Sequence, residues 1–487
     1  MNKTFFTFLF FLISSFAIMN VNGGEKAPKI HALVDIAHEF TFYFDGRFGN
    51  AYLKPIGGID ARCWSVLSAA DLSNINLLVI PQGNTPCPYT ADDLKAVLRF
   101  VREEGGGLLM IGNYGIFKGE NEFKLNQLAK RFGIEFVRDK PKGKLRILAN
   151  EIIKKEVSEV QGQASGVLHW REGLPWRKLV VDEEGRAVVA VREFGKGRVC
   201  AIHGSGLMGD KPKDGEAMNS KWLCPLIQWL SANKTIDPAK PPKGTSPEKE
   251  KIVEGGLKVQ YSAYLESYAD EIVKLYFQVA EQLREIMGVP LAEGMNTTLI
   301  LLPTGGGGFS SGVALGIGVW WGGFPENPYY MIELIGHEAT HSWVLPFPEP
   351  MWNEGIATYM GIEVGKRLGY VKEAEESRRG WASACEKIDP NYDKIDISQP
   401  EQPGFHEVYM AKPMWIWDRL REKYGDEIIA RYFQTKRKLI KEGKLKSYTA
   451  DDCVAVLSIA AGEDLFDWFN SLGIKVSREK ASIKFEK

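Results

Sequence analysis

The sequence predicts an α/β domain followed by a mostly helical α+β domain. Strand-like and helix-like segments alternate up to residue 232, and long amphipathic helix patterns dominate from residue 253. Apolar strands separated by helices are typical of a parallel sheet covered on both faces. Residues 233–252 contain four prolines among Lys, Gly, Ser and Glu, which predicts a semi-rigid polar linker. We therefore expect domains at 24–232 and 253–487.

The composition is that of a globular protein. Of 487 residues, 44% are hydrophobic and 25% are charged, which excludes a wholly disordered, collagen-like or coiled-coil chain. The 61 basic and 62 acidic residues leave a net charge of -1. This balance does not favour nucleic acid or an anionic membrane as a partner. The composition does not indicate an oligomeric state.

Residues 1–23 have the features of a secretory signal peptide. Lys3 precedes a mainly apolar stretch at 5–19, and small residues follow it. This stretch is shorter than the roughly 20 residues that span a bilayer, although an uncleaved anchor is an alternative. No later stretch is long and apolar enough to span a membrane. We expect a secreted or periplasmic protein without an integral membrane segment after removal of the signal.

Export permits disulfides, but six cysteines are too few for a disulfide scaffold. Cys63, Cys87, Cys200 and Cys224 precede the linker, and Cys385 and Cys453 follow it. The sequence leaves open whether the cysteines form disulfides within each half or stay as buried free thiols.

In the first domain, strands are expected at 30–36, 77–80, 107–112, 186–191 and 199–203, the last two as a pair. Thr90 is placed to cap a helix whose apolar residues follow helical spacing, and residues 222–230 predict another helix. The segments LLVIPQG (77–83), EEGGGLLMIGNYG (103–115) and FGKGRVCAIHGSG (194–206) resemble the class I glutamine amidotransferase-like fold, a flavodoxin-like three-layer domain.

That family carries a catalytic cysteine in the turn after the GLLMIG-type strand. Here the turn reads Gly-Asn-Tyr-Gly (112–115), and neither Asn nor Tyr can replace a thiol nucleophile. The resemblance therefore implies a non-catalytic binding or docking domain, and it excludes a glutamine-hydrolysing enzyme.

The main chemical motif is His-Glu-Ala-Thr-His at 337–341. Its apolar flanks predict a helix that ends before Pro346. Positions i and i+4 of a helix share a face, so His337 and His341 can bind one Zn²⁺ while Glu338 reaches a metal-bound water.

Catalytic zinc usually takes three protein ligands and one water. Glu354 begins a second predicted helix in the segment WNEGIATYM (352–360), thirteen residues after His341. Its carboxylate can return to the metal if the two helices pack together. The alternative is a solvated acid at a helix start beside a chance pair of histidines.

The two motifs together resemble gluzincin zinc metallopeptidases, the thermolysin-like and aminopeptidase N-type enzymes. Residues 418–433 and 448–474 resemble the helical region after the zinc site of the aminopeptidase N type. The resemblance implies a mostly α gluzincin domain with one Zn²⁺ per chain, held by His337, His341 and Glu354. It also implies that Glu338 is the general base.

A tyrosine is the expected donor to the oxyanion. The resemblance points to Tyr409, which precedes a predicted helix starting near Pro413. His406 is the competitor, because thermolysin-like enzymes use an imidazole for this task.

Residues 304–324 are rich in glycine and are interpreted as an edge strand of the substrate cleft, carried by VALGIGVWWG, or as a surface loop. An edge strand can bind peptide backbone by strand addition. Aminopeptidase N-type enzymes place a glutamate there for the free amino terminus of the substrate, whereas this stretch contains no acid. Exo- and endopeptidase activity therefore both stay open.

The function expected from the sequence is a secreted zinc metallopeptidase acting on a peptide or protein substrate. The alternative is a binding or scaffolding protein with an inactive peptidase fold. The intact Glu338 disfavours the alternative, because a structural zinc needs no general base.

Overall fold

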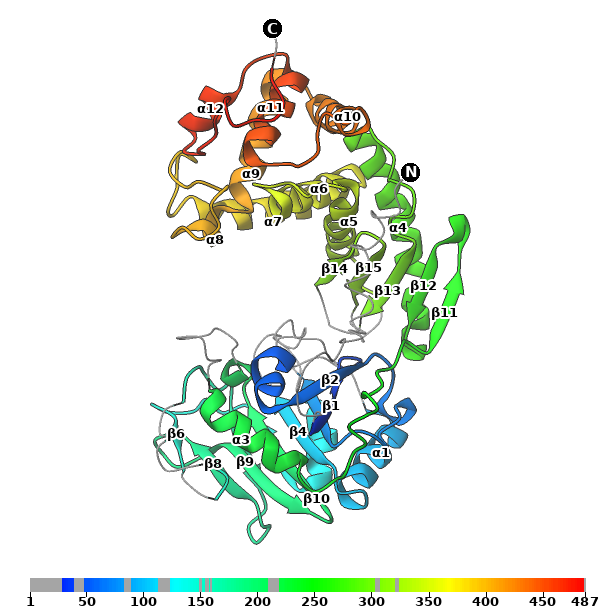
Figure 1. Ribbon diagram of the computed structural model, residues 1–487, viewed down its shortest axis with the longest axis vertical. Helices are drawn as coiled ribbons and strands as arrows, with labels where there is room; N and C mark the ends of the chain where they lie inside the picture. The colour runs from blue at the N-terminus through cyan, green and yellow to red at the C-terminus, as the bar shows by residue number, and fades with distance from the viewer. Residues whose placement is uncertain are drawn as a thin grey trace.

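The structure is a computed structural model that describes residues 29–38, 48–82, 89–112, 123–148, 151–153, 157, 160–208, 219–302, 307–319 and 324–485. The predicted signal peptide, Cys87 and residues 113–115 of the expected turn lie outside these ranges. The chain forms two lobes, each with its own sheet (Figure 1). In the described ranges, no helix combines the length and the apolar character needed to cross a bilayer.

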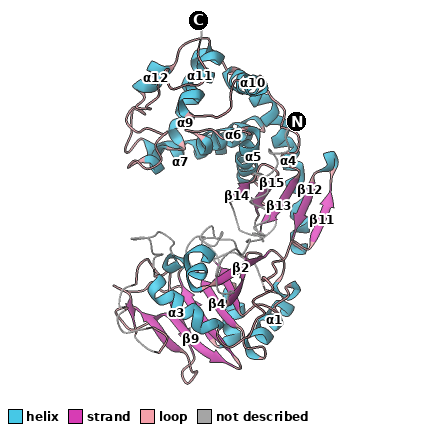
Figure 2. Cartoon of the chain, viewed as in Figure 1, coloured by secondary structure: helices cyan, strands magenta, loops and turns pink. Residues whose placement is uncertain are grey.

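The N-terminal lobe contains a ten-stranded mixed sheet (Figure 2). Its strands are β1 Ile30–Asp35, β2 Gly58–Cys63, β3 Leu77–Gln82, β4 Gly107–Gly112, β5 Ile134–Val137, β6 Arg146–Ile147, β7 Val167–Trp170, β8 Arg177–Val181, β9 Ala187–Phe194 and β10 Gly197–His203. The order is β2-β1-β3-β4-β10-β9-β7-β5, with β8 beside β9 and β6 beside β8. Strands β2, β1, β3, β4 and β10 run parallel, and the others join antiparallel.

Helices cover both faces of this sheet. They are α1 Ala91–Arg102, α2 Leu125–Ala129 and α3 Ser220–Ser231, with short helical turns at Gly49–Leu53, Lys54–Ile56, Leu67–Ala69, Lys130–Phe132 and Ser205–Met208. The core on one face includes α1, and the core on the other includes α3. As expected, Thr90 caps α1, because its hydroxyl accepts from the amide of Asp93 while the Asp93 carboxylate accepts from the amide of Thr90.

The expected α/β lobe is confirmed, but only half of its sheet is parallel. The expected pair at 186–191 and 199–203 forms the β9–β10 hairpin. Its turn is Gly195-Lys196, and Gly195 has a φ of 62°. Two residues can join only antiparallel strands, because a parallel connection needs a crossover of a dozen or more residues. The hairpin therefore starts the antiparallel half of the sheet, which the sequence analysis missed.

A buried charged cluster follows β1. The Nδ1 atom of His38 lies 2.9 Å from a carboxylate oxygen of Asp35, and its Nε2 atom lies 3.7 Å from one of Asp93. The ring of His38 stacks on Tyr89 at 4.4 Å. Burial alone would lower the pKa of His38, but Asp35 and then Asp93 raise it to about 9.

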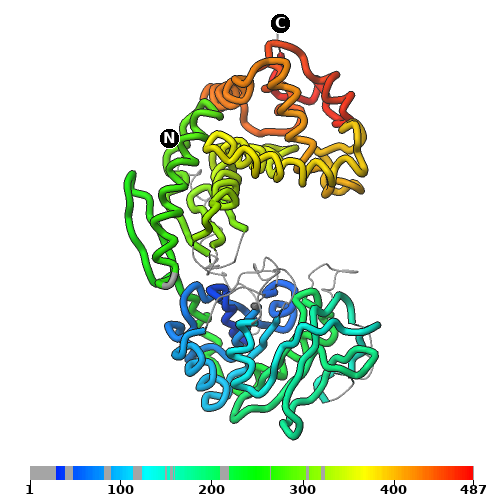
Figure 3. Tube along the Cα trace, turned by 180° about the vertical axis from the view of Figure 1, so that it is seen from behind, coloured from blue at the N-terminus to red at the C-terminus, as the bar shows by residue number. Residues whose placement is uncertain are grey.

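The C-terminal lobe is mostly helical, as expected, and contains a five-stranded sheet. The strands are β11 Lys249–Ile252, β12 Lys258–Tyr261, β13 Thr298–Leu302, β14 Gly308–Ser310 and β15 Ala314–Gly318, in the order β11-β12-β13-β15-β14. The helices are α4 Glu266–Met287, α5 Tyr329–Trp343, α6 Asn353–Arg367, α7 Val371–Cys385, α8 Phe405–Val408, α9 Ala411–Tyr424, α10 Ile428–Lys441, α11 Ala450–Ala461 and α12 Phe466–Ser471, with short turns at Glu254–Gly256 and Ala263–Leu265. A single extended segment joins the two lobes on one side of the molecule (Figure 3).

The edge strand differs from the one expected. The residues Ala314–Gly318 of the VALGIGVWWG segment form β15, which lies between β13 and β14. The edge is the three-residue strand β14, Gly308–Ser310, running antiparallel to β15. Gly312, with a φ of 82°, turns the chain between them. The expectation missed this hairpin because β14 is too short to show a strand pattern.

Of the two possibilities for the cysteines, disulfides or buried free thiols, the structure favours free thiols. Cys63, Cys200, Cys385 and Cys453 are buried free thiols. The possible pairing of Cys385 with Cys453 is therefore wrong. Both thiols lie in the helical core of the second lobe, where a thiol packs as a small apolar group.

Candidate metal centre

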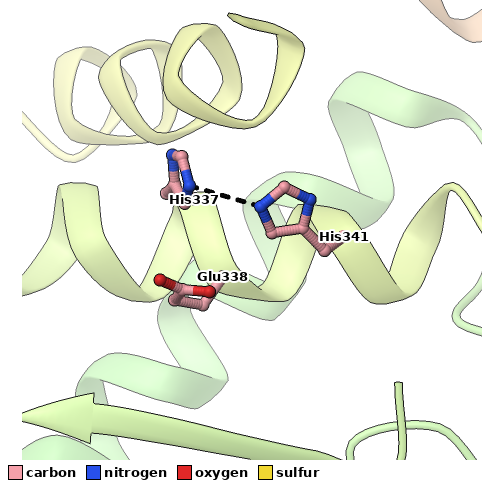
Figure 4. A group of neighbouring side chains, drawn as sticks. All are labelled: His337, Glu338 and His341. Atoms are coloured by element: carbon pink, nitrogen blue, oxygen red, sulfur yellow. Dashed lines mark hydrogen bonds between the residues drawn. The ribbon is translucent and has the colours of Figure 1, made fainter. Parts of the chain in front are cut away.

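Helix α5 presents the two histidines and the glutamate of the first motif. Figure 4 shows the imidazoles of His337 and His341 and the carboxylate of Glu338 on adjacent turns of this helix. The Nε2 atoms of the two histidines are 3.3 Å apart. The ligand atoms of all three residues lie within 4.8 Å of one another. The expected helical spacing therefore gathers three groups that can hold a metal ion.

Helix α6 brings Glu354 to the same place. One carboxylate oxygen of Glu354 lies 3.3 Å from Nε2 of His337, and the other lies 3.6 Å from Nε2 of His341. A tetrahedral zinc with bonds of about 2.0–2.2 Å separates its ligand atoms by about 3.3–3.6 Å. The three predicted ligands thus have the mutual distances that such an ion requires.

A close crossing of two helices positions these ligands. A Cβ atom at Gly336 of α5 would lie 2.8 Å from the Cα atom of Gly361 in α6. A Cβ atom at Gly361 would lie 2.4 Å from the carbonyl oxygen of Glu333. Only glycine permits so close an approach of the two helices. Because Glu354 lies two turns before Gly361, the crossing brings its carboxylate next to His337.

Thr358 orients the first histidine. Its hydroxyl lies 3.0 Å from Nδ1 of His337 and donates to the carbonyl oxygen of Glu354 at 3.0 Å or to the sulfur of Met410 at 3.3 Å. Because its one proton is used there, the hydroxyl accepts from Nδ1–H of His337. The lone pair on Nε2 is then free for a metal. Sequence reasoning missed Thr358, which lies one turn after Glu354 on α6.

The second histidine has its own partner. Nδ1 of His341 lies 3.1 Å from the side-chain amide of Asn353, the residue that begins α6. This contact fixes the ring so that Nε2 points toward Glu354. Asn353 is the second supporting residue that the sequence analysis did not single out.

Burial controls the proton affinities at the site. The pKa of Glu338 is raised to about 7 by burial, which outweighs the lowering by His337 and is assisted by the charge of Glu354. Burial and then the nearby His337 lower the pKa of His341 to about 4, although Glu354 and Asn353 raise it in part. The pKa of Glu354 is lowered, first by its close contact with the ring of His337. A neutral imidazole at His341 beside an ionised carboxylate suits metal binding, and a glutamate near neutrality suits proton transfer.

Strand β14 runs beside Glu338. A Cβ atom at Gly308 would lie 2.9 Å from Oε1 of Glu338 and 2.6 Å from the carbonyl oxygen of Gly316. Further along, the hydroxyls of Ser310 and Ser342 are 3.0 Å apart, which joins the strand to α5. Within the described residues, β14 pairs with β15 alone, so its other edge has no strand partner there.

Tyr409 lies next to the start of α6. A Cβ atom at Gly355 would lie 2.8 Å from the carbonyl oxygen of Tyr409. The pKa of this half-buried tyrosine is raised, mainly by burial and then by the charge of Glu354. His406 is exposed and contacts the rings of Phe405 and Tyr409. The structure thus brings Tyr409 to the neighbourhood of Glu354 and leaves His406 at the surface.

Comparisons with known proteins assign no family. No family model matches the chain, and no curated protein matches it. Similar solved structures include a cytoplasmic protein from Salmonella typhimurium LT2, at 16% identity over 42% of this chain and 100% of that one, with a TM-score of 0.30. Another is an aminopeptidase N family protein from Idiomarina loihiensis, at 14% identity over 46% of this chain and 48% of that one, with a TM-score of 0.31. Likeness at these scores assigns neither a fold nor a function.

Proposed function

We propose that this protein is a secreted, zinc-dependent peptidase of the gluzincin type. The observation that carries the proposal is the convergence of His337, His341 and Glu354. The two Nε2 atoms are 3.3 Å apart, and they lie 3.3 and 3.6 Å from the two carboxylate oxygens of Glu354. Two neutral imidazoles and a carboxylate form a ligand set that zinc hydrolases use. One Zn²⁺ per chain would polarise a substrate carbonyl and lower the pKa of a bound water.

The residues of the chain supply the proton transfers. Glu338 takes a proton from the attacking water and passes it to the leaving amine. Its pKa of about 7, raised by burial, suits both steps near neutral pH. The phenol of Tyr409 donates a hydrogen bond to the oxyanion that forms at the substrate carbonyl.

The substrate is a peptide or protein bound in extended form. Strand β14 offers an edge beside Glu338, and a peptide added there forms main-chain hydrogen bonds with the strand. The missing side chain of Gly308 lets this strand lie close to the base, because a Cβ atom there would come 2.9 Å from Oε1 of Glu338.

The N-terminal lobe is proposed to be a glutamine amidotransferase-like, flavodoxin-like domain without glutaminase activity. Its parallel strands in the order β2-β1-β3-β4-β10, covered by α1 and α3, support this proposal. The lack of a cysteine at 112–115 removes the nucleophile.

The decisive test compares Glu338→Gln with Glu333→Gln, a carboxylate one turn earlier on α5 whose partner is Ser377. On denatured casein, Glu338→Gln should lower hydrolysis by about 10²–10⁴ while zinc content stays unchanged. Glu333→Gln should keep most of the activity. A zinc-loaded protein that cleaves nothing, or a fully active Glu338→Gln variant, would contradict the proposal.

A further inference from the structure

A residue of the N-terminal lobe packs on the second face of the C-terminal sheet. Along β13, Leu299 and Leu301 belong to the core shared with the helices. Ile300 and Leu302 point to the opposite face and form a separate buried cluster with Ala314 of β15. The residues packed against this cluster are Phe309 of β14 and Trp64, which directly follows β2 of the first lobe.

Trp64 is held in place by the linker. Its amide donates to the hydroxyl of Thr245 at 3.0 Å, and its carbonyl accepts from Ser262 at 3.4 Å. Glu248 bridges the lobes, because its two carboxylate oxygens accept from the amides of Val66 at 2.7 Å and Ala263 at 3.0 Å. These bonds join the end of β2 to the turn before α4.

The two faces of β14 touch different parts of the molecule. The ring of Phe309 lies across Gly316, where a Cβ atom would come within 2.2 Å of it, and so faces the cluster with Trp64. Its neighbours Gly308 and Ser310 face α5, at Glu338 and Ser342. A single three-residue strand therefore lies between Trp64 and the proposed general base.

Strand β14 is short, and its other contacts among the described residues include the amide of Gly307, which donates to the hydroxyl of Tyr330 at 2.9 Å, and the Ser310–Ser342 contact at 3.0 Å. It pairs with β15 over three residues, and glycines with positive φ stand on either side, 71° at Gly307 and 82° at Gly312. Such a strand is set by packing rather than by its backbone, because glycine adds conformational freedom.

We propose that Trp64 is a positioning residue for substrate binding in the second lobe. By packing on the cluster of Ile300, Leu302 and Ala314, against which Phe309 also packs, it holds β14 at the depth where an added peptide strand lies beside Glu338. The inference rests on the proposed peptidase function. It makes the N-terminal lobe a support of the substrate cleft, since loss of the indole would leave β14 to be ordered by the substrate itself.

The test uses the full-length protein with Trp64→Ala, Trp64→Phe and the matched control Trp229→Ala, a half-buried tryptophan of α3 that lies over Arg198. Main-chain bonds to β14 act equally in the ground and transition states. Trp64→Ala should therefore raise KM roughly 5–20-fold with kcat within about twofold. Trp64→Phe should restore most of the loss. Trp229→Ala should leave KM unchanged.

Hydrogen exchange without substrate gives a readout independent of hydrolysis. Amides in residues 307–319 should exchange faster in Trp64→Ala than in wild type, with zinc content unchanged. Glu248→Ala, which removes the bridge without touching the cluster, should shift exchange in the same direction. Wild-type exchange at 307–319 in both variants, or an unchanged KM for Trp64→Ala, would overturn the inference. Absent hydrolysis in wild type would overturn the proposed function instead, and exchange would still decide the role of Trp64.

Discussion

Replacing Gly361 by alanine perturbs the crossing of α5 and α6 without altering any proposed ligand. The new Cβ atom would lie 2.4 Å from the carbonyl oxygen of Glu333. Carbon–oxygen contacts of this kind are rarely shorter than about 3.3 Å. The two backbones must therefore separate locally by about 1 Å. The Cβ atom is fixed to the backbone of α6 and the oxygen is part of the backbone of α5, so rotation of a side chain cannot relieve the clash.

The two helix backbones would separate next to the proposed metal ligands. His337 lies four residues after Glu333, and its Nε2 atom is 3.3 Å from Glu354. Metal sites tolerate deviations of about 0.2 Å, so a shift of about 1 Å should remove one ligand from coordinating distance. We expect zinc affinity to fall at least 100-fold, roughly the upper range for disturbing the support of a ligand. Overpacking should also cost about 1–3 kcal/mol in unfolding free energy, partly offset by the better helix propensity of alanine.

The assay is competition for zinc with a chelator of known affinity, together with urea unfolding of the metal-free protein. Gly380→Ala is the matched control, because Gly380 lies inside α7 and a Cβ atom added there would have no atom within 4 Å of it. That variant should keep zinc affinity and gain up to about 1 kcal/mol of stability. Wild-type zinc affinity in Gly361→Ala would refute the claim that this crossing sets the ligand geometry.

Three further variants probe other parts of the account. Gly308→Ala should keep zinc but lower kcat/KM by about 10²-fold, because its Cβ atom would lie 2.9 Å from the Glu338 carboxylate; wild-type kcat/KM would contradict this. Tyr409→Phe should lower kcat by roughly 10²–10³ with little change in KM, and steady-state kinetics showing unchanged kcat would exclude Tyr409 as the oxyanion donor. The pKa of His38, about 9 when folded against an ordinary 6.5, stabilises the folded state fully below pH 6.5 and progressively less as pH rises through 9. Urea unfolding between pH 6 and 9.5 should show this loss in wild type but not in His38→Gln, and equal pH profiles would contradict it.

The proposed ligands could be found from the sequence because each depends on local spacing. His337 and His341 are one turn apart, and Glu354 begins the next helix, so helix geometry alone puts them on facing surfaces. Thr358 follows from the same periodicity, one turn after Glu354, but a threonine in an apolar helix gives no signal of its own. The α/β and helical parts were predictable for the same reason, since their apolar periodicity is local.

Features that depend on tertiary packing could not be read from the chain. The close approach of Gly336 and Gly361 needs two helices to cross at one point, and a glycine in a helix pattern does not name its partner. Trp64 and Phe309 pack on the same apolar cluster although they belong to different lobes. The edge strand was placed on the wrong segment because its three residues depend on pairing with β15 rather than on their own propensity.

The most direct test of the central claim is the zinc content of the purified full-length protein and of His341→Ala, measured by elemental analysis after dialysis against trace chelator. The geometry predicts one zinc per chain in wild type, because His337, His341 and Glu354 have mutual distances of 3.3 to 3.6 Å. His341→Ala should hold almost none, since it removes one of only three protein ligands. Full zinc content in His341→Ala, in a protein that folds as wild type does, would contradict the assignment of the metal centre.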